Sequence, residues 1–161
     1  MPTATSTRFE IAAEAFRGAI DAAQPREPVF TVARRIRGAL AEVYYAAIEL
    51  GVPSFVNEVD DPPDVDRSGS AAIEARLRKC FADDDRFLDV WDPTNPEKGD
   101  PIWRTLSAEL VEIHEDLGVA LAHLANNEST NAAIWDVVQA FESHWGKHAV
   151  DVARPLHHLA Q

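Results

Sequence analysis

Two histidines and three carboxylates at helical spacing are the residues of this sequence best suited to chemistry. His144 and His148 are four residues apart, so a helix places both imidazoles on one face. Glu109, Glu112 and Asp116 recur at spacings of three and four residues on one flank of an apolar stripe. Imidazoles that face carboxylates can supply the ligands of a metal ion, and a neighbouring carboxylate also raises a histidine pKa and orients the ring. Carboxylates beside an apolar stripe are equally typical of a solvated helix, so the pattern becomes specific only if the two groups meet.

The elements that must bring them together are two long C-terminal helices. Apolar side chains recur with a helical period over residues 101–126, beginning at a proline suited to a first turn, and again over residues 129–159. A short connection centred near Glu128 makes these helices antiparallel neighbours. Residues equally distant from that centre have similar heights, which places His148 level with Glu109. The sequence therefore predicts that the histidines and the carboxylates share one groove.

The remaining segments complete an all-α prediction for one helical domain spanning residues 1–161. Helical periodicity indicates an N-terminal helix pair within residues 7–50, and an acidic loop with three prolines follows at residues 51–69. A short helix, an aromatic-Asp-Pro element and the C-terminal hairpin occupy residues 70–161. The short apolar stretch near Phe87 is compatible with a strand or a turn. We therefore expect a helical bundle of about five helices with a long antiparallel C-terminal hairpin.

Charge and composition exclude several classes of partner. The chain has 161 residues, with 27 acidic against 15 basic side chains and a formal net charge of −12. A negative protein is poorly suited to nucleic acid or an anionic membrane surface, because both carry the same sign of charge. No stretch approaches the roughly 20 apolar residues that span a bilayer, and the single cysteine, Cys80, cannot form an internal disulfide. We expect a cytoplasmic protein that binds neither nucleic acid nor membrane.

Three segments resemble a known bacterial family. The His-Trp-Gly-Lys-His-Ala run of residues 144–149 is similar to the closing signature of the family called domain of unknown function 5063. Residues 91–93, Trp-Asp-Pro, resemble its aromatic-Asp-Pro element, and residues 106–117 resemble its acidic helix. Ala108 and Pro155 depart from the family pattern, where an acid and a small helix former are expected. The resemblance implies a helical bacterial protein and supplies no activity.

Gly146 and Pro155, in and after this run, predict local features of the helix backbone. A glycine inside a helix costs about 1 kcal/mol relative to alanine, so Gly146 indicates close approach by a neighbouring segment or a ligand. Pro155 removes the hydrogen bond to the carbonyl of Asp151 and is expected to kink the helix beyond that residue.

Three function classes follow from these residues. The first is a non-enzymatic bundle that binds a partner protein, basic in charge, or a small ligand in the groove. Its binding residues would be Glu109, Glu112, Asp116, His144, Trp145, Gly146, His148 and Asp151. The second is a metal-dependent, hydrolase-type enzyme with a divalent metal held by His144, His148 and Glu112 or Asp116, and a remaining acid as general base. The third is a purely structural subunit.

Overall fold

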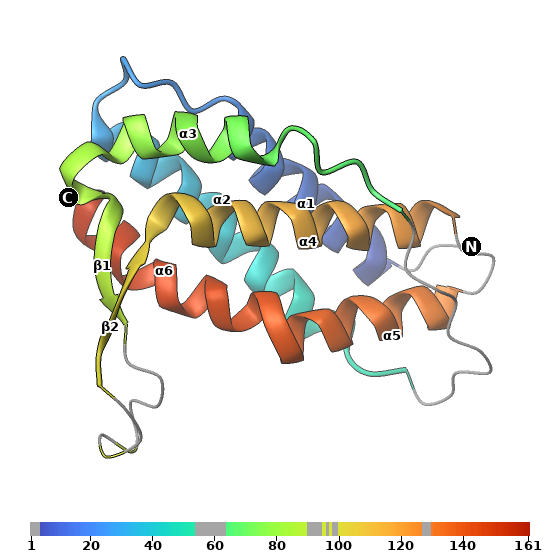
Figure 1. Ribbon diagram of the computed structural model, residues 1–161. Helices are drawn as coiled ribbons and strands as arrows, with labels where there is room; N and C mark the ends of the chain where they lie inside the picture. The colour runs from blue at the N-terminus through green and yellow to red at the C-terminus, as the bar shows by residue number, and fades with distance from the viewer. Residues whose placement is uncertain (1–3, 54–63, 90–94, 96, 98–99, 127–129) are drawn as a thin grey trace.

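A helical bundle with one small β-hairpin forms the structure (Figure 1). The computed structural model describes residues 4–53, 64–89, 95, 97, 100–126 and 130–161. Its helices are α1 (Ala4–Asp21), α2 (Val29–Leu50), α3 (Ser70–Phe81), α4 (Leu106–Asn126), α5 (Thr130–Ala140) and α6 (Gly146–Leu159). Between α3 and α4 lie a 3₁₀ turn η1 (Ala82–Asp85) and the strands β1 (Arg86–Asp89) and β2 (Ile102–Thr105), and a π-helical turn η2 (Phe141–Trp145) joins α5 to α6. The expected all-α bundle is confirmed in its main architecture.

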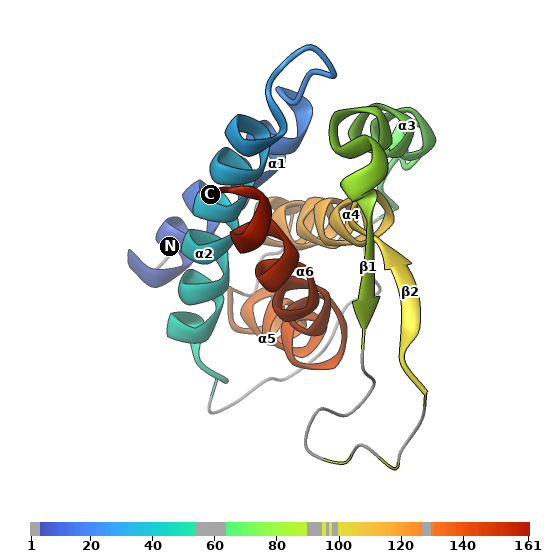
Figure 2. The ribbon, with the colours of Figure 1, turned by 90° about the vertical axis from the view of Figure 1, so that its left-hand side faces the viewer.

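The N-terminal helix pair packs through apolar side chains at helical spacing. Phe9 and Phe16 of α1 are fully buried, as are Ile36 and Val43 of α2. Burial of side chains of this size contributes about 1.5–3 kcal/mol each. Gly51 ends α2 with a φ of 64°, a left-handed conformation that glycine adopts without steric cost. Figure 2 shows α1 and α2 on one side of α4 and α6, with α3 and the strands on the other.

The C-terminal hairpin is formed as the sequence predicts. Helix α4 runs antiparallel to the continuous α5–η2–α6 segment and packs against it (Figures 1 and 2). Helix α6 also packs against α2, so its apolar face is buried on two sides. Pro155, at which the sequence predicts a kink, lies inside α6 and does not end it, since the helix continues to Leu159.

One segment of the predicted hairpin is wrong. Residues 102–105 form strand β2, and α4 begins only at Leu106. The strand pairs with β1 in antiparallel register, Phe87 opposite Arg104 and Asp89 opposite Ile102. Helix α4 begins there because the buried Asp85 accepts hydrogen bonds of 2.8 Å from both the backbone N–H and the hydroxyl of Ser107. Strand β1 and Asp85 both lie well before this segment in the sequence. The local helical period contains no sign of them, and the predicted helix therefore began too early.

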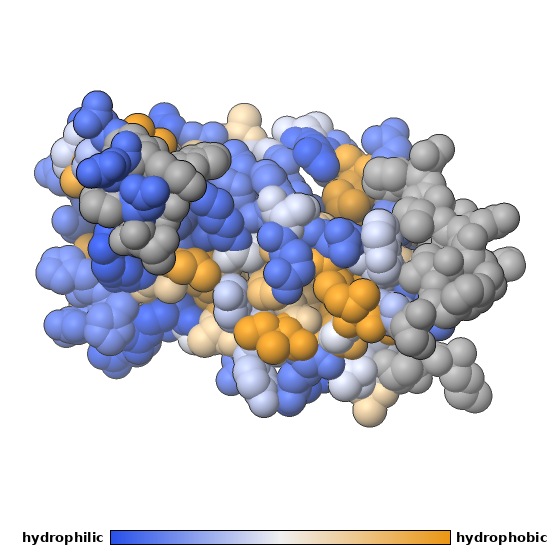
Figure 3. Space-filling model, turned by 90° about the horizontal axis from the view of Figure 1, so that it is seen from below, coloured by the Kyte–Doolittle hydropathy of each residue, from blue (hydrophilic) through white to orange (hydrophobic). Residues whose placement is uncertain are grey.

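The surface retains apolar area outside the core. Figure 3 shows apolar residues gathered near the middle of the underside of the molecule, below α5 and α6. An apolar groove of about 300 Å³ lies between α2 and α6 and is lined by Leu40, Tyr44 and Val150, among others. Among the described residues, no helix combines the length and the hydrophobicity needed to traverse a bilayer.

Two sequence predictions fall largely outside the described residues. The acidic loop of residues 51–69 includes residues 54–63, which lie outside the described part of the chain, while residues 64 and 66–69 are exposed. The aromatic-Asp-Pro element at residues 91–93 also lies outside it.

Candidate metal centre

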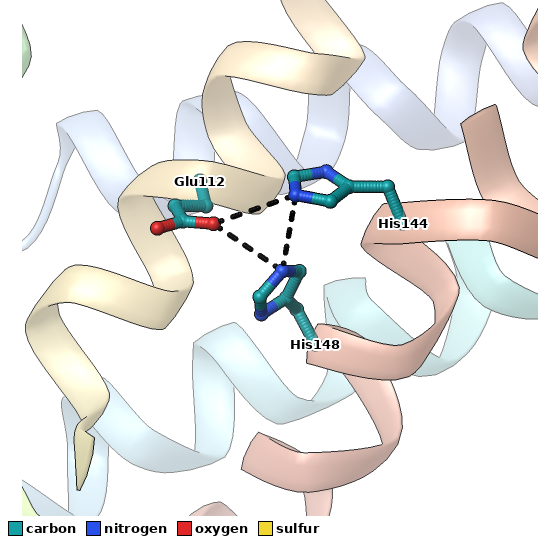
Figure 4. Close-up of side chains that lie close together, drawn as sticks. All are labelled: Glu112, His144 and His148. Atoms are coloured by element: carbon teal, nitrogen blue, oxygen red, sulfur yellow. Dashed lines mark hydrogen bonds and ion pairs between the residues drawn. The ribbon is translucent and has the colours of Figure 1, made fainter.

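Helix α4 supplies the carboxylates of the site, and the η2–α6 junction supplies its imidazoles. Glu112 projects from α4 toward His144, which lies on the π-helical turn, and toward His148, which lies in the first turn of α6 (Figure 4). The structure thus brings His144 and His148 against the predicted carboxylates Glu109, Glu112 and Asp116. The structure places His148 level with Glu109, as counting residues along the two helices predicts.

Three ligand atoms form a compact triangle. Oε2 of Glu112 lies 3.2 Å from Nε2 of His148 and 3.7 Å from Nε2 of His144. The two Nε2 atoms are 3.4 Å apart, and the rings meet edge to face with centroids 4.7 Å apart. At that separation the two nitrogens cannot both direct a hydrogen at each other, so at least one presents a lone pair.

The other nitrogen of each ring is held by a carboxylate. Nδ1 of His144 lies 2.6 Å from Oδ2 of Asp116, and Nδ1 of His148 lies 2.5 Å from Oε2 of Glu109. An ionised carboxylate only accepts hydrogen bonds, so each Nδ1 carries the hydrogen. In the neutral rings, the lone pairs of both Nε2 atoms are therefore directed into the triangle.

The inner carboxylate is fixed in turn by the β-hairpin. Arg104 of β2 donates from Nη1 to Glu109 over 2.8 Å and from Nε to Asp89 over 2.7 Å. Burial alone would raise the pKa of Glu109, but the hydrogen bonds from His148 and Arg104 outweigh it and lower this pKa. The hydrogen bond to Glu109 raises the pKa of His148, against the opposing effect of burial. Glu109 is thus held as a carboxylate that orients His148.

Burial divides the site into an inner and an outer half. The side chains of Glu109 and His148 are only 7% and 11% exposed, whereas those of Glu112 and His144 are 50% and 52% exposed. A group bound in the triangle would therefore be enclosed on one side and open to solvent on the other.

Comparison with known proteins identifies the family and the fold. A family model described as Domain of unknown function (DUF5063) matches residues 14–161. The chain belongs to this family. It is also similar to the crystal structure of protein BF1032 from Bacteroides fragilis, at 19% identity and a TM-score of 0.78, over 98% of this chain and 93% of that one. That likeness shows a common fold, and a comparison with curated proteins finds no match.

Gly146 is required by the fold of its own segment rather than by contact with another segment or a ligand. A Cβ on Gly146 would collide with the carbonyl oxygen and the ring of Phe141, one π-helical turn earlier in the same segment. The N–H of Gly146 itself bonds to that carbonyl. The expected close approach is therefore made by the helix's own preceding turn. Single π turns inside helices are frequent at functional sites, and this one carries His144.

Two of the predicted binding residues lie apart from the cluster. Trp145 is fully buried in the core, with its ring centroid 4.8 Å from that of Phe141. The carboxylate of Asp151 pairs with Lys147 at 2.9 Å on the same helix. Among the described residues, the side chains placed to hold one ion are Glu112, His144 and His148, and Asp151 is not one of them.

Arg104 and Asp89 are the site residues that sequence reasoning missed. Arg104 fell inside the expected helix of residues 101–126, where its direction would have been different. The strand pairing places the Arg104 and Asp89 side chains on one face of the hairpin. The only sequence signal was the Ile-Trp-Arg-Thr composition of β2, which favours a strand.

Proposed function

We propose that this DUF5063 protein binds a divalent transition-metal ion of the zinc class through Glu112, His144 and His148. Through the open side of that ion, it binds a small ligand or a side chain of a partner protein. Asp116 and Glu109 orient the two imidazoles, and Arg104 keeps Glu109 in place. The proposal combines the metal site and the binding function that the sequence left as separate alternatives.

The observation that carries the proposal is the size of the triangle. A tetrahedral zinc ion has ligand bonds of about 2.0–2.2 Å, which separates neighbouring ligand atoms by about 3.3–3.5 Å. The edges of the triangle measure 3.2, 3.4 and 3.7 Å. Small side-chain movements would bring all three atoms to bonding distance from one central ion. Two imidazoles and one carboxylate are also the ligand set of open zinc sites that keep a fourth position for another molecule.

The carboxylates behind the imidazoles add independent support. Metal-bound histidines commonly donate their second N–H to a carboxylate, which fixes the tautomer and raises ligand basicity. Here both histidines have that arrangement, at 2.6 Å for His144 and 2.5 Å for His148. Two carboxylate–histidine pairs around one point favour a metal site over an ordinary solvated helix surface.

Binding is favoured over hydrolysis because the acids are already engaged. A metal-dependent hydrolase needs a base near the metal-bound water, and Glu109 and Asp116 were the candidates. Each of them is occupied by a histidine Nδ1, and Glu109 also by Arg104. The formal charge of −12 further favours a cationic partner or ligand over an anionic substrate.

The test is metal binding by protein that carries no affinity tag. After dialysis against chelator, titration calorimetry with Zn²⁺ should give a stoichiometry of one, and native mass spectrometry should give the mass of one bound ion. His148→Ala and Glu112→Gln should each weaken binding by about a hundredfold or more. His158→Ala, which removes an exposed histidine from the same helix, is the matched control and should bind as the parent protein does.

Two outcomes would overturn the proposal. One is the absence of stoichiometric binding with Zn²⁺, Co²⁺ and Ni²⁺ alike. The other is equal affinity in the parent protein, His148→Ala and Glu112→Gln, which would place any metal elsewhere. If His148→Ala lowers only the melting temperature, the cluster has a structural role.

A further inference from the structure

A second cavity lies on the other side of α4, away from the candidate metal centre. It has a volume of about 330 Å³, is open to solvent on one side, and is lined by α1, α4 and the segment that enters α3. This size is near the lower end of small-molecule pockets, roughly 300–1,000 Å³. Its polar lining includes Arg17, Asp21, Arg67, Ser70, His114 and Glu115.

Arg17 supplies a positive charge to the wall of this cavity. Its Nη1 donates to the backbone carbonyl of His114 over 3.1 Å, and among the described residues it forms no ion pair with a carboxylate. The guanidinium lies against Gly118, where an added Cβ would collide with Nη1. The missing side chain at Gly118 therefore creates the space that holds Arg17.

His114 gives a second, independent indication of a ligand. The residue is only 6% exposed, and its Nε2 has no hydrogen-bond partner among the described residues. The nearest acid is Asp21, at 3.5 Å, which is longer than a normal hydrogen bond to a ring nitrogen. Burial, assisted by Arg17, lowers the pKa of His114 and favours the neutral ring. A buried imidazole nitrogen facing a polar cavity is costly unless another molecule satisfies it.

The start of α3 adds a partial positive charge to the same wall. Gly69 occupies the N-cap position, and the N–H groups of Ser70 and Ile73 in this first turn already donate to the carbonyls of Arg67 and Gly69, so the turn offers its dipole rather than a row of free donors. Both Gly69 and Ser70 line the cavity. Arg17 is therefore the group that would hold a carboxylate, and the dipole of α3 favours the same negative charge.

The opposite charge is also present in the cavity. Asp21, Asp66 and Glu115 line it beside Arg17 and Arg67, so with neutral His114 the lining has a formal charge of −1. Such a lining disfavours a dianionic phosphate. It suits a ligand whose single negative charge lies next to a positive one.

We propose that this cavity binds a free α-amino acid, with its carboxylate at Arg17, near the start of α3. The ammonium group is held by the acidic side of the cavity, formed by Asp21 and Glu115. Their present ion pairs are long, 3.7 Å from Asp21 to Arg76 and 3.4 Å from Glu115 to Arg67, and leave room for a closer cation. The site is separate from the metal centre and requires no metal.

The test is calorimetric titration of metal-free protein with the standard L-amino acids. At least one should bind with a dissociation constant below about 1 mM. Its carboxamide, which lacks the carboxylate, and its N-acetyl form, which lacks the ammonium, should each bind at least tenfold more weakly. Arg17→Gln and Gly118→Ala should weaken binding by tenfold or more. Arg26→Gln, an equal charge change at an exposed residue, is the control and should not.

Three results would overturn the assignment. These are no binding by any standard amino acid, equal binding of the N-acetyl or carboxamide form, and unchanged binding by both variants. Should both variants unfold, the ring signals of His114 in NMR spectra of the parent protein decide the question. They should shift on addition of the amino acid, and unchanged signals contradict the proposal.

Discussion

The two halves of the candidate metal centre use the same chemistry in different surroundings. In each half a carboxylate of α4 holds the Nδ1 of a histidine, Glu109 with His148 inside and Asp116 with His144 outside. The inner carboxylate is 7% exposed and also bonded to Arg104, whereas the outer one is 20% exposed and its histidine 52% exposed. Burial makes the inner pair a structural anchor, and the exposed outer pair lies on the side from which we propose that a ligand reaches the metal.

The largest difference between the halves should appear in stability. Glu109→Gln keeps the shape of the side chain but leaves the part-buried His148 without its close anionic partner and Arg104 with Asp89 alone. Loss of a charge from such a network is expected to lower the free energy of unfolding by about 2–3 kcal/mol. Asp116→Asn, in the more exposed half, should cost less than about 1 kcal/mol. Urea unfolding of metal-free protein measures both, and equal losses would show that the halves do not differ.

Metal affinity should also depend on Arg104, a residue of the inner half that is not a proposed metal ligand. Arg104→Gln leaves Glu112, His144 and His148 intact but loosens Glu109, which orients the His148 ring. Changes behind metal-bound histidines cost about 10–100-fold in affinity, and we expect a loss in that range for Zn²⁺. Arg86→Gln is the matched control on β1, since Arg86 stacks on Trp103 with 4.9 Å to the ring centroid. Equal affinities of the two variants would mean that the hairpin does not position the site.

The stability contributed by the inner pair, Glu109 and His148, should change with pH in opposite directions with and without bound metal. The pKa of His148 is raised, so in metal-free protein its contribution to stability is present below the ordinary value of 6.5 and lost as pH rises through the raised value. The pKa of Glu109 is lowered, so its contribution is present above 4.5 and lost as pH falls through the lowered value. The pair therefore stabilises the metal-free fold most between pH 4.5 and 6.5.

Above the ordinary histidine pKa, bound zinc should reverse the change of stability with pH. The ion requires neutral His148 and competes with the proton for it. Unfolding free energies measured from about pH 5.5 to about 8.5 should thus fall with pH in chelator relative to His148→Gln, and rise with pH in Zn²⁺. His158→Gln should keep the parent profile under both conditions. A metal-free slope that His148→Gln leaves unchanged would assign the pH dependence to other groups.

Local pattern was sufficient for the helices and for the meeting of their polar flanks. The helical period, with one short connection, placed His148 level with Glu109, and the two side chains are in contact. Rotation and height along a helix follow from counting residues, so these features can be predicted from one sequence.

Pairings between distant segments could not be predicted in the same way. Strand β2 depends on β1, and the start of α4 depends on Asp85, which lies 22 residues before Ser107. The anchoring role of Arg104 follows from those two facts. The π turn was also missed, because its extra residue depends on how Phe141 and Trp145 pack, and Gly146 was consequently assigned to an outside contact.

The smallest effect is expected at Asp151, which the sequence placed in the binding groove. In the structure its carboxylate pairs with Lys147 at 2.9 Å, four residues earlier on α6. Asp151→Asn removes this helical ion pair, which is worth about 0.3–0.5 kcal/mol, and leaves the metal triangle unchanged. Zinc affinity should therefore change by less than about twofold, against the 10–100-fold loss expected for Arg104→Gln. Calorimetry on the two variants side by side measures this contrast. A tenfold loss for Asp151→Asn would extend the centre along α6 and return Asp151 to the set of binding residues.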